Sequence, residues 1–456
     1  MKRWTIALAA ALVAGTAGAQ AQPAAPLPVQ WYEALPHGGA KASLQQWWAQ
    51  FEDPLLLRLV DAAQAASPDV AAAASRIAQS RASRTSAGAA LLPSVDANLG
   101  AARGRSELQQ PIANSGSAGL QWSWELDLFG GNRAGARAAD ARAVAADAGW
   151  HEARVAVAAE VAASYTQLRA CEARLVQTQI DVTSREETAR LTSASRQFGM
   201  QSPGNEALAR ASAAQARAGA TQLMAQCSAL VKSLVAMTGF DEVQLRTELA
   251  AATARLPRPA QIEVNDVPAR ALAQRPDLLA AERNVVAASA DWDQSRARQW
   301  PRLVLQGNVG RAHAETSWSN ASGSVWSFGP VSLVLPVFDG GQRKAQAEAA
   351  RAKFDEAGVV YRAKLRQAVR EVETALLSLH STAGRAQDAR IAAEGFRVSL
   401  QATDTRYRGG LASLFELEEA RRSDVQSQIS LIDLEQERVQ AWINLYRALG
   451  GGWEAS

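Results

Sequence analysis

The sequence has little of several features that define other classes of protein. Beyond its first residues it contains no apolar run of about 18 residues, which excludes a transmembrane helix as its membrane anchor. Lys and Arg number 48 against 45 Asp and Glu, and no basic block stands out, so no nucleic-acid partner is indicated. No linker rich in Pro, Gly and Ser separates two halves. Any crossing of a membrane must therefore use β-strands, which need only about ten alternating residues each.

Residues that commonly carry out chemistry are also scarce. The four His are far apart in the sequence, and no spacing between them suits metal ligands. The chain shows no phosphate-binding glycine loop, no nucleophile elbow and no paired carboxylates in a recognisable catalytic context. The sequence therefore predicts no enzyme, no catalytic residue, no cofactor and no metal.

The first residues have the pattern of an export signal, which we assign to residues 1–21. Two basic residues precede the short apolar stretch from Ile6 to Ala14, and small residues allow cleavage after Ala19 or Ala21. No cysteine follows that could accept a lipid, so no lipid anchor is expected. The mature protein is predicted to work outside the cytoplasm.

The rest of the chain consists of two repeats of one sequence pattern. Landmarks recur about 209 residues apart, far longer than the period of a solenoid, which indicates an ancient duplication. The recurring pairs include Ser67-Pro68-Asp69 with Arg275-Pro276-Asp277, Leu92-Pro93-Ser94 with Trp300-Pro301-Arg302, and Phe198-Gly199 with Tyr407-Arg408-Gly409. The sequence predicts two repeats, residues 22–250 and residues 251–456.

Each repeat is predicted to contain a helix, two strands, a very long helix, a tight tip turn and a return helix. In the first repeat the strands are expected at about 94–104 and 118–129, the long helix at about 133–197 and the tip turn at about 198–205. In the second repeat they are expected at about 301–312 and 325–338, 342–406, and 407–415. At 1.5 Å per residue, a helix of about 65 residues reaches nearly 100 Å, and its 3-4 spacing of apolar residues is typical of a coiled coil.

The predicted strands alternate between apolar and polar residues, so each has one face suited to lipid. The residues predicted to face lipid are Leu120, Trp122, Trp124, Leu126 and Leu128, and in the second repeat Val331, Leu333, Leu335 and Val337. Four strands cannot close a barrel, and an open sheet edge in lipid leaves backbone groups unpaired at several kcal/mol each. The strands must therefore be completed by other protomers.

Five motifs in a fixed order carry a resemblance that covers nearly the whole mature chain. They are Trp48-x-x-Phe51-x-Asp53-Pro54-Leu55, Trp124-Glu125-Leu126-Asp127-Leu128-Phe129-Gly130, Leu335-Pro336-Val337-Phe338-Asp339-Gly340-Gly341, Tyr407-Arg408-Gly409-Gly410 and Tyr446-Arg447-Ala448-Leu449-Gly450-Gly451-Gly452-Trp453. On these motifs the chain resembles the TolC-like outer-membrane factor family, in particular its NodT-like, RND-linked branch.

The resemblance implies an α+β membrane protein in the outer membrane of a Gram-negative bacterium. In this family three protomers each contribute four strands to one transmembrane β-barrel, which continues into the periplasm as a long α-helical, coiled-coil barrel. The implied function is a passive exit duct for small molecules in a tripartite efflux system. The implied partners are a homotrimer, outer-membrane lipid, a periplasmic membrane-fusion adaptor and an inner-membrane RND-type pump.

The resemblance also implies that the two tip turns meet the adaptor. The candidate contact residues are Phe198, Gly199, Gly204, Tyr407, Arg408, Gly409 and Gly410. The four glycines are expected to let the backbone reverse with positive φ. The chain departs from the family twice: most members of the branch carry a lipidated cysteine, and some carry aspartates after the second turn, where this chain has Gly410-Leu411-Ala412-Ser413.

The two cysteines flank the first tip turn. Cys171 lies about 30 residues before it and Cys227 about 26 after it, so antiparallel helices place them nearly level. They form either a disulfide, which the oxidising periplasm permits, or two buried thiols if their offset forbids the bond.

Two other functions remain open from the sequence. The chain could be the exit duct of type I protein secretion, although the Trp48 and Asp53 start and the Gly-Gly-Trp end favour the RND-linked branch. It could also be a periplasmic coiled-coil scaffold with a small soluble sheet, which would require polar residues on both strand faces. The apolar alternation from Trp122 to Leu128 argues against the scaffold.

Overall fold

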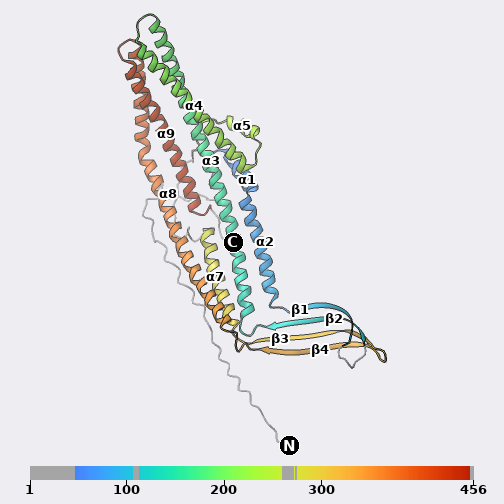
Figure 1. Cartoon of the computed structure of the whole chain (residues 1–456). Coiled ribbons are helices and arrows are strands. Elements are labelled where there is room, and N and C mark those ends of the chain that lie inside the picture. Colours follow the sequence, from blue (N-terminus) through green and yellow to red (C-terminus); the bar gives the residue numbers. More distant parts are fainter. Residues whose placement is uncertain (1–46, 106–111, 259–271, 273–274, 452–456) are drawn as a thin grey trace.

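The computed structural model describes residues 47–105, 112–258, 272 and 275–451; the predicted signal peptide lies outside them. Long helices form an elongated body with a four-stranded sheet at one end and two helix turns at the other (Figure 1). The first half contains η3 (Trp48–Phe51), α1 (Pro54–Ala66), α2 (Pro68–Ala89), β1 (Ser94–Gly104), β2 (Ala113–Leu126), α3 (Gly131–Gln197), α4 (Pro203–Thr238) and α5 (Glu242–Ala250). The second half contains α7 (Pro276–Ala297), β3 (Arg302–Glu315), β4 (Asn320–Val334), α8 (Gln342–Arg408) and α9 (Leu414–Ala448).

Serine caps and prolines start the shorter helices. Ser67 caps α2 and Ser202 caps α4, and in both cases the next residue is a proline in the first helical turn, where its missing N–H costs nothing. Ser413 and Glu416 form a capping box at the start of α9, each side chain bonding the other's backbone N–H. These caps decide where each return helix begins after its turn.

The long helices α3 and α8 contain 67 residues each, which corresponds to about 100 Å. Each runs antiparallel to its return helix, so α3 with α4 and α8 with α9 form two hairpins that lie side by side (Figure 1). A carboxylate holds the start of each long helix: Asp127 accepts the Arg133 N–H at 2.8 Å, and Asp339 accepts the Arg343 N–H at 3.3 Å. Both helices thereby begin directly beside the sheet.

The sheet is antiparallel throughout, in the order β1-β2-β3-β4. The central pair, β2 with β3, joins the two repeats, and β1 and β4 are the edges. Strand β2 ends at Leu126 and β4 at Val334, earlier than the predicted ends near residues 129 and 338. The predicted ends were wrong because Asp127 turns to cap α3, and because Pro336 has no N–H to donate to a ladder.

The main hydrophobic core lies midway along the helices, where η3 and α1 pack against the ends of the hairpins. The fully buried ring of Trp47 lies 5.9 Å from that of Trp442 and 5.7 Å from that of Tyr446, distances at which aromatic rings pack favourably.

Within the described ranges, no single helix has the length and apolarity to span a membrane; only the α4 and α5 pair, bent by 119°, meets that test jointly.

Candidate functional site: sheet faces and tip turns

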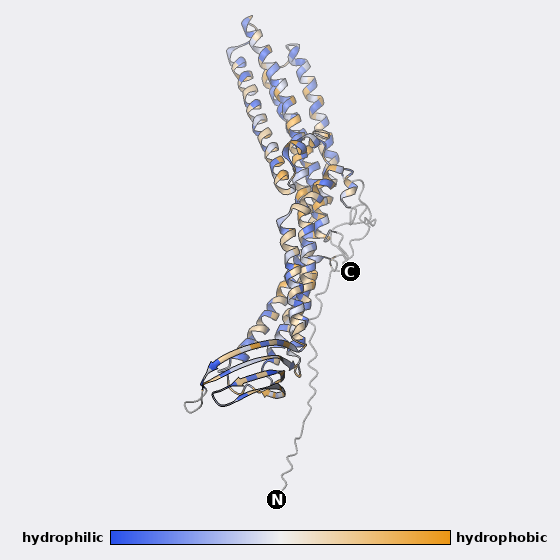
Figure 2. Cartoon of the chain, turned by 90° about the vertical axis from the view of Figure 1, so that its right-hand side faces the viewer, coloured by the Kyte–Doolittle hydropathy of each residue, from blue (hydrophilic) through white to orange (hydrophobic). Residues whose placement is uncertain are grey.

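In the half of the sheet nearer the helices, one face is apolar across all four strands; farther out the same face carries polar residues such as Arg311 and His313. Leu120 on β2 lies opposite Ala97 and Val309, and Val309 lies opposite Trp326 on β4. Because directly paired residues point to the same side, the register collects one apolar set. Its members are Val95, Ala97, Leu99, Leu120, Trp122, Trp124, Leu126, Leu303, Leu305, Val309, Trp326, Phe328, Val331 and Leu333. Figure 2 shows hydrophobic and hydrophilic residues interleaved along the strands.

The opposite face of the sheet is polar. Its polar residues include Asp96, Asn98, Gln121, Ser123, Glu125, Gln306, Asn308, Ser327 and Ser332, and Val304, Val325 and Val334 also lie on this face. Asn98 donates to the Gln121 side chain at 3.4 Å on this face. The sheet is therefore two-sided, with one surface suited to hydrocarbon and the other to water.

Three residues predicted to face lipid do not lie in the strands. Leu128 follows the end of β2, and Leu335 and Val337 follow the end of β4, so all three belong to the connections into the long helices. Their predicted place in a strand was wrong because the prediction extended the alternation past Asp127 and Pro336, where the ladder stops.

The alternation of β4 changes phase inside the strand. Phe328 pairs with Gly307 and Val331 with Leu305, so Gly329 and Pro330 together stand opposite a single residue of β3. Such a bulge reverses the parity, and it puts Trp326 and Phe328 on the apolar face although their numbers are even. Neither residue was in the predicted lipid-facing set; the signal for the change of phase was the Gly-Pro pair, which marks bulges in strands.

Trp122 packs closely against the sheet and against a second aromatic residue of the apolar face. Its ring lies over Gly307, where a Cβ would come within 2.5 Å of the indole Nε1, and its centroid is 5.6 Å from that of Phe328. The absence of a side chain at Gly307 therefore makes room for the indole. Trp124 donates its indole N–H to the Leu91 carbonyl at 3.0 Å, which ties the sheet to the end of α2.

The tip consists of two short turns at the end farthest from the sheet (Figure 1). Gly199 and Gly410 supply the positive φ values, +74° and +75°. Gly204 lies within α4, and Gly409 has a φ of −81° at the end of α8, so the expectation of positive φ at these two was wrong. Phe198 precedes Gly199, whereas Tyr407 and Arg408 form the last turn of α8.

Polar contacts tie the two hairpins together near the tip. The Tyr407 hydroxyl of α8 lies 3.2 Å from the Thr192 hydroxyl of α3. Deeper in, Arg185 of α3 donates to the Glu418 carboxylate of α9 at 2.6 Å, and buried Arg421 donates to the same carboxylate at 2.9 Å. The positions of the two turns are therefore coupled within one chain.

Carboxylates at the turns are held in their charged form. Hydrogen bonds from Arg196 and Ser193 lower the pKa of Glu206 below its ordinary value. The backbone and side chain of Ser413 lower the pKa of Glu416 in the same way. Both acids stay ionised at neutral pH and fix the starts of α4 and α9.

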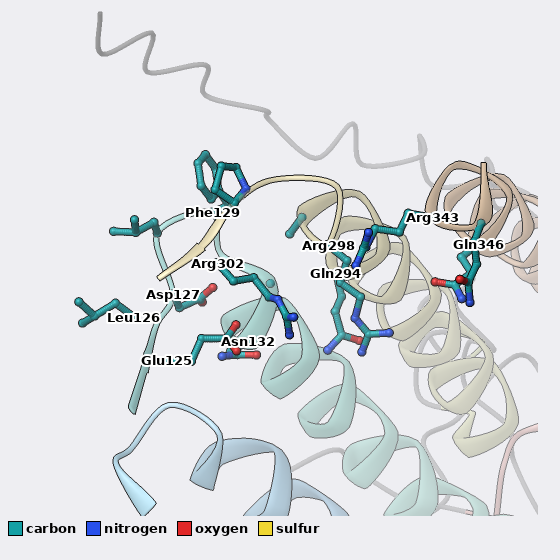
Figure 3. A pocket seen from close by; sticks show the side chains of 15 residues that line it. Glu125, Leu126, Asp127, Phe129, Asn132, Gln294, Arg298, Arg302, Arg343 and Gln346 are labelled. Atoms are coloured by element: carbon teal, nitrogen blue, oxygen red, sulfur yellow. The ribbon is translucent and has the colours of Figure 1, made fainter. Parts of the chain in front are cut away.

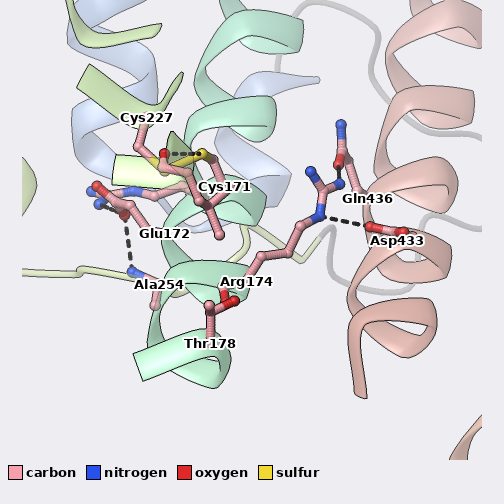
Figure 4. Close-up of a disulfide and its surroundings, with 10 residues drawn as sticks. Cys171, Glu172, Arg174, Thr178, Cys227, Ala254, Asp433 and Gln436 are labelled. Atoms are coloured by element: carbon pink, nitrogen blue, oxygen red, sulfur yellow. Dashed lines mark hydrogen bonds and ion pairs between the residues drawn. A yellow bond between two sulfur atoms is a disulfide. The ribbon is translucent and has the colours of Figure 1, made fainter. Parts of the chain in front are cut away.

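Cys171 of α3 and Cys227 of α4 are joined by a disulfide, with Cα atoms 5.6 Å apart (Figure 4). Both cysteines are buried in the main core, at the level of α5. The bond closes a loop with a sequence separation of 56 residues that includes the first tip turn. It thus fastens the first hairpin at its base.

We expect loss of this bond to destabilise the first hairpin. Replacing both cysteines by serine (Cys171→Ser with Cys227→Ser) should lower the free energy of unfolding by about 2–4 kcal/mol, because the unfolded loop regains its freedom. Denaturant unfolding followed by helical circular dichroism measures this. A reductant should destabilise the natural chain and leave the double variant unchanged; equal sensitivity of both would contradict the prediction.

A sheet with one apolar face, built onto helices about 100 Å long, defines the class of outer-membrane channels in which each chain supplies part of a helical barrel and part of a β-barrel. Comparison of the chain with known proteins supports this class. The model of the outer membrane efflux protein family matches residues 59–240 and 267–451, so the chain belongs to this family.

The similarity to known proteins covers almost the full chain. The pyoverdine export outer membrane protein OpmQ of Pseudomonas putida is 31% identical, over 90% of this chain and 89% of that protein. Outer membrane protein OprJ of Pseudomonas aeruginosa is 30% identical, over 100% of this chain and 97% of that protein. The solved outer-membrane channel OprN superposes with a TM-score of 0.83 at 26% identity, over 95% of this chain and 99% of that one. The predicted fold class and the predicted function as an efflux exit duct are confirmed.

Proposed function

We propose that three copies of the chain form one channel, in which the apolar sheet face meets outer-membrane lipid and the polar face lines the duct. The observation that carries this is the sheet itself: its apolar face continues across all four strands, while β1 and β4 remain edges. Unpaired edges are costly in lipid, so β4 of one copy must pair with β1 of the next until the ring closes. The three-fold ring follows from the family resemblance.

We further propose that the tip turns dock on a periplasmic membrane-fusion adaptor linked to an inner-membrane RND-type pump, which supplies the energy. The support is the position of the turns at the end opposite the sheet, and the exposure of Phe198 and Leu411 there. The chain then performs no chemistry and acts as a passive duct for small molecules. Solute selection would rest mainly with the pump.

Membrane fractionation with native mass determination in detergent tests the assembly. The chain should be recovered from the outer-membrane fraction at three times the mass of the mature protomer. It should also restore drug tolerance to a strain that lacks its own exit duct but retains a matching adaptor and pump. A soluble periplasmic monomer would refute the channel and leave the scaffold hypothesis.

The tip proposal predicts a selective loss of docking. Leu411 is 74% exposed, so Leu411→Asp should leave the trimer intact while placing a charge on an apolar contact. We expect about tenfold weaker adaptor binding, equivalent to about 1.4 kcal/mol, measured by surface-immobilised trimer against purified adaptor. Val243, which is also 74% exposed but lies on α5, provides the matched control Val243→Asp. Equal loss in both variants would argue against tip docking.

A further inference from the structure

A cavity of about 410 Å³ lies where the sheet meets the helices (Figure 3). Its walls come from the ends of β2 and α7, the start of β3 and the first turns of α3 and α8. All of these elements belong to one chain, so the cavity is complete in a single protomer. We call it the junction pocket.

Two guanidinium groups of the junction pocket have no carboxylate partner. Among residues 47–105, 112–258 and 275–451, no Asp or Glu lies within ion-pairing distance of Arg298 or Arg302. The third lining arginine, Arg343, is already paired with Asp339 at 3.1 Å. Of the two lining carboxylates, Asp127 is paired with Arg133, which leaves Glu125. The pocket therefore carries two unpaired positive charges against one negative charge.

Neutral donors surround the same space. The lining includes the side-chain amides of Asn132, Gln294 and Gln346, and Figure 3 shows Gln294 beside Arg298. Gln294 is held in place because its amide packs over Gly135 of α3, where a Cβ would come within 2.5 Å of the amide nitrogen. The helices α3 and α8 also point their positive ends toward the pocket, although Asp127 and Asp339 already cap them.

The junction pocket opens on the polar side of the sheet. Glu125 pairs with Val304 in the ladder, and Arg302 lies two residues from Val304 on the same strand, so both point away from the apolar face. If the polar face lines the duct, as proposed above, the pocket faces the passing solute rather than lipid. In a trimer it would recur three times around the junction of the sheet and the helices.

We propose that the junction pocket binds the carboxylate or phosphate group of an anionic solute inside the duct. Two guanidinium groups together with amide donors provide the forked hydrogen bonds that such oxyanions accept. Rings of arginine that line a pore favour anions. This inference rests on the proposed function for its place in the duct, but the binding itself requires only one chain.

Arginine modification tests the binding. The purified protein in detergent is treated with phenylglyoxal, with and without inorganic phosphate, and the modified peptides are quantified by mass spectrometry. Phosphate should slow modification of Arg298 and Arg302 at least tenfold and leave Arg311, near the far end of β3, unchanged. In equilibrium dialysis, the double variant Arg298→Gln with Arg302→Gln should bind phosphate at least tenfold more weakly, whereas Arg311→Gln should bind as the natural chain does.

Three outcomes would overturn the proposal. One is equal protection of Arg311, which would indicate a general salt effect. Another is unchanged phosphate binding in the double variant. The third is protection by phosphatidylglycerol vesicles but not by phosphate, which would assign the pocket to lipid. Because the pocket belongs to one chain, a protein that fails to form trimers can still be assayed, so failure of the channel proposal is distinguishable from failure of this one.

Discussion

Trp122→Arg is expected to abolish the proposed trimer in the outer membrane. Trp122 lies near the centre of the apolar face, between Val95 and Gly307 in the register, and it packs against Phe328. An arginine near the middle of a lipid-facing strand costs about 2–4 kcal/mol, and in a trimer the cost arises three times. The substitution also removes the indole from its place over Gly307. Unheated gel electrophoresis of the outer-membrane fraction measures the loss.

The neighbouring residue provides a matched control. Gln121 lies one position away on the same strand but on the polar face, so Gln121→Arg places the same charge on the face proposed to line the duct. That variant should form trimers in the natural amount. A stable trimer with arginine at position 122, or equal loss with arginine at 121, would mean that the apolar face does not meet lipid.

Arg169→Ala is expected to lower the free energy of unfolding by about 3–5 kcal/mol, since it removes one partner of a buried charged network. Arg169 is fully buried in α3. It donates to the Tyr165 hydroxyl at 3.0 Å, to the Glu172 carboxylate at 2.8 Å and to the Leu249 carbonyl at 3.0 Å. Its guanidinium also lies 5.0 Å from the centre of the Tyr165 ring.

The destabilisation should extend to α1, the first α-helix of the first repeat. The Tyr165 hydroxyl, which Arg169 contacts, donates to Asp53 at 2.6 Å, and the same Asp53 caps α1. Burial and this hydrogen bond raise the pKa of Tyr165, so it stays protonated as the donor at neutral pH. Loss of Arg169 therefore removes one hydrogen-bond donor each from Glu172 and the Leu249 carbonyl. It also weakens the contact between Tyr165 and Asp53 that holds the start of α1.

Denaturant unfolding of the helical signal measures this change. In the part of the chain that the structure describes, the ion-pair partner of Arg190 on α3 is Glu187 on the surface, which makes Arg190→Ala the control for loss of an arginine without burial. Surface pairs contribute little, so the control should unfold at the same denaturant concentration as the natural chain. An equal midpoint for Arg169→Ala would show that the buried network carries no net stability.

Much of the architecture was predictable because it depends on local patterns. The repeated Pro-Asp helix starts and the 3-4 spacing of the long helices are visible within one or two turns of chain. Alternation likewise identified the apolar side of β2, and Leu120, Trp122, Trp124 and Leu126 lie on one face of the sheet. The ends of β2 and β4 were harder to predict from the sequence. Asp127 and Pro336 end the two ladders, and neither effect is visible in the alternation of apolar and polar residues.

The sequence by itself determined the order of the elements, their duplication and which side of β2 is apolar, because helix and strand periodicities arise between near neighbours. Only the tertiary structure decided how distant segments meet. It pairs β2 with β3 across the two repeats, shifts the phase of β4 at Gly329 and Pro330, and brings Cys171 within bonding distance of Cys227. It also gathers Arg298 and Arg302 with the starts of α3 and α8 around one cavity. These contacts depend on register and helix packing over many residues, which no short window of the chain records.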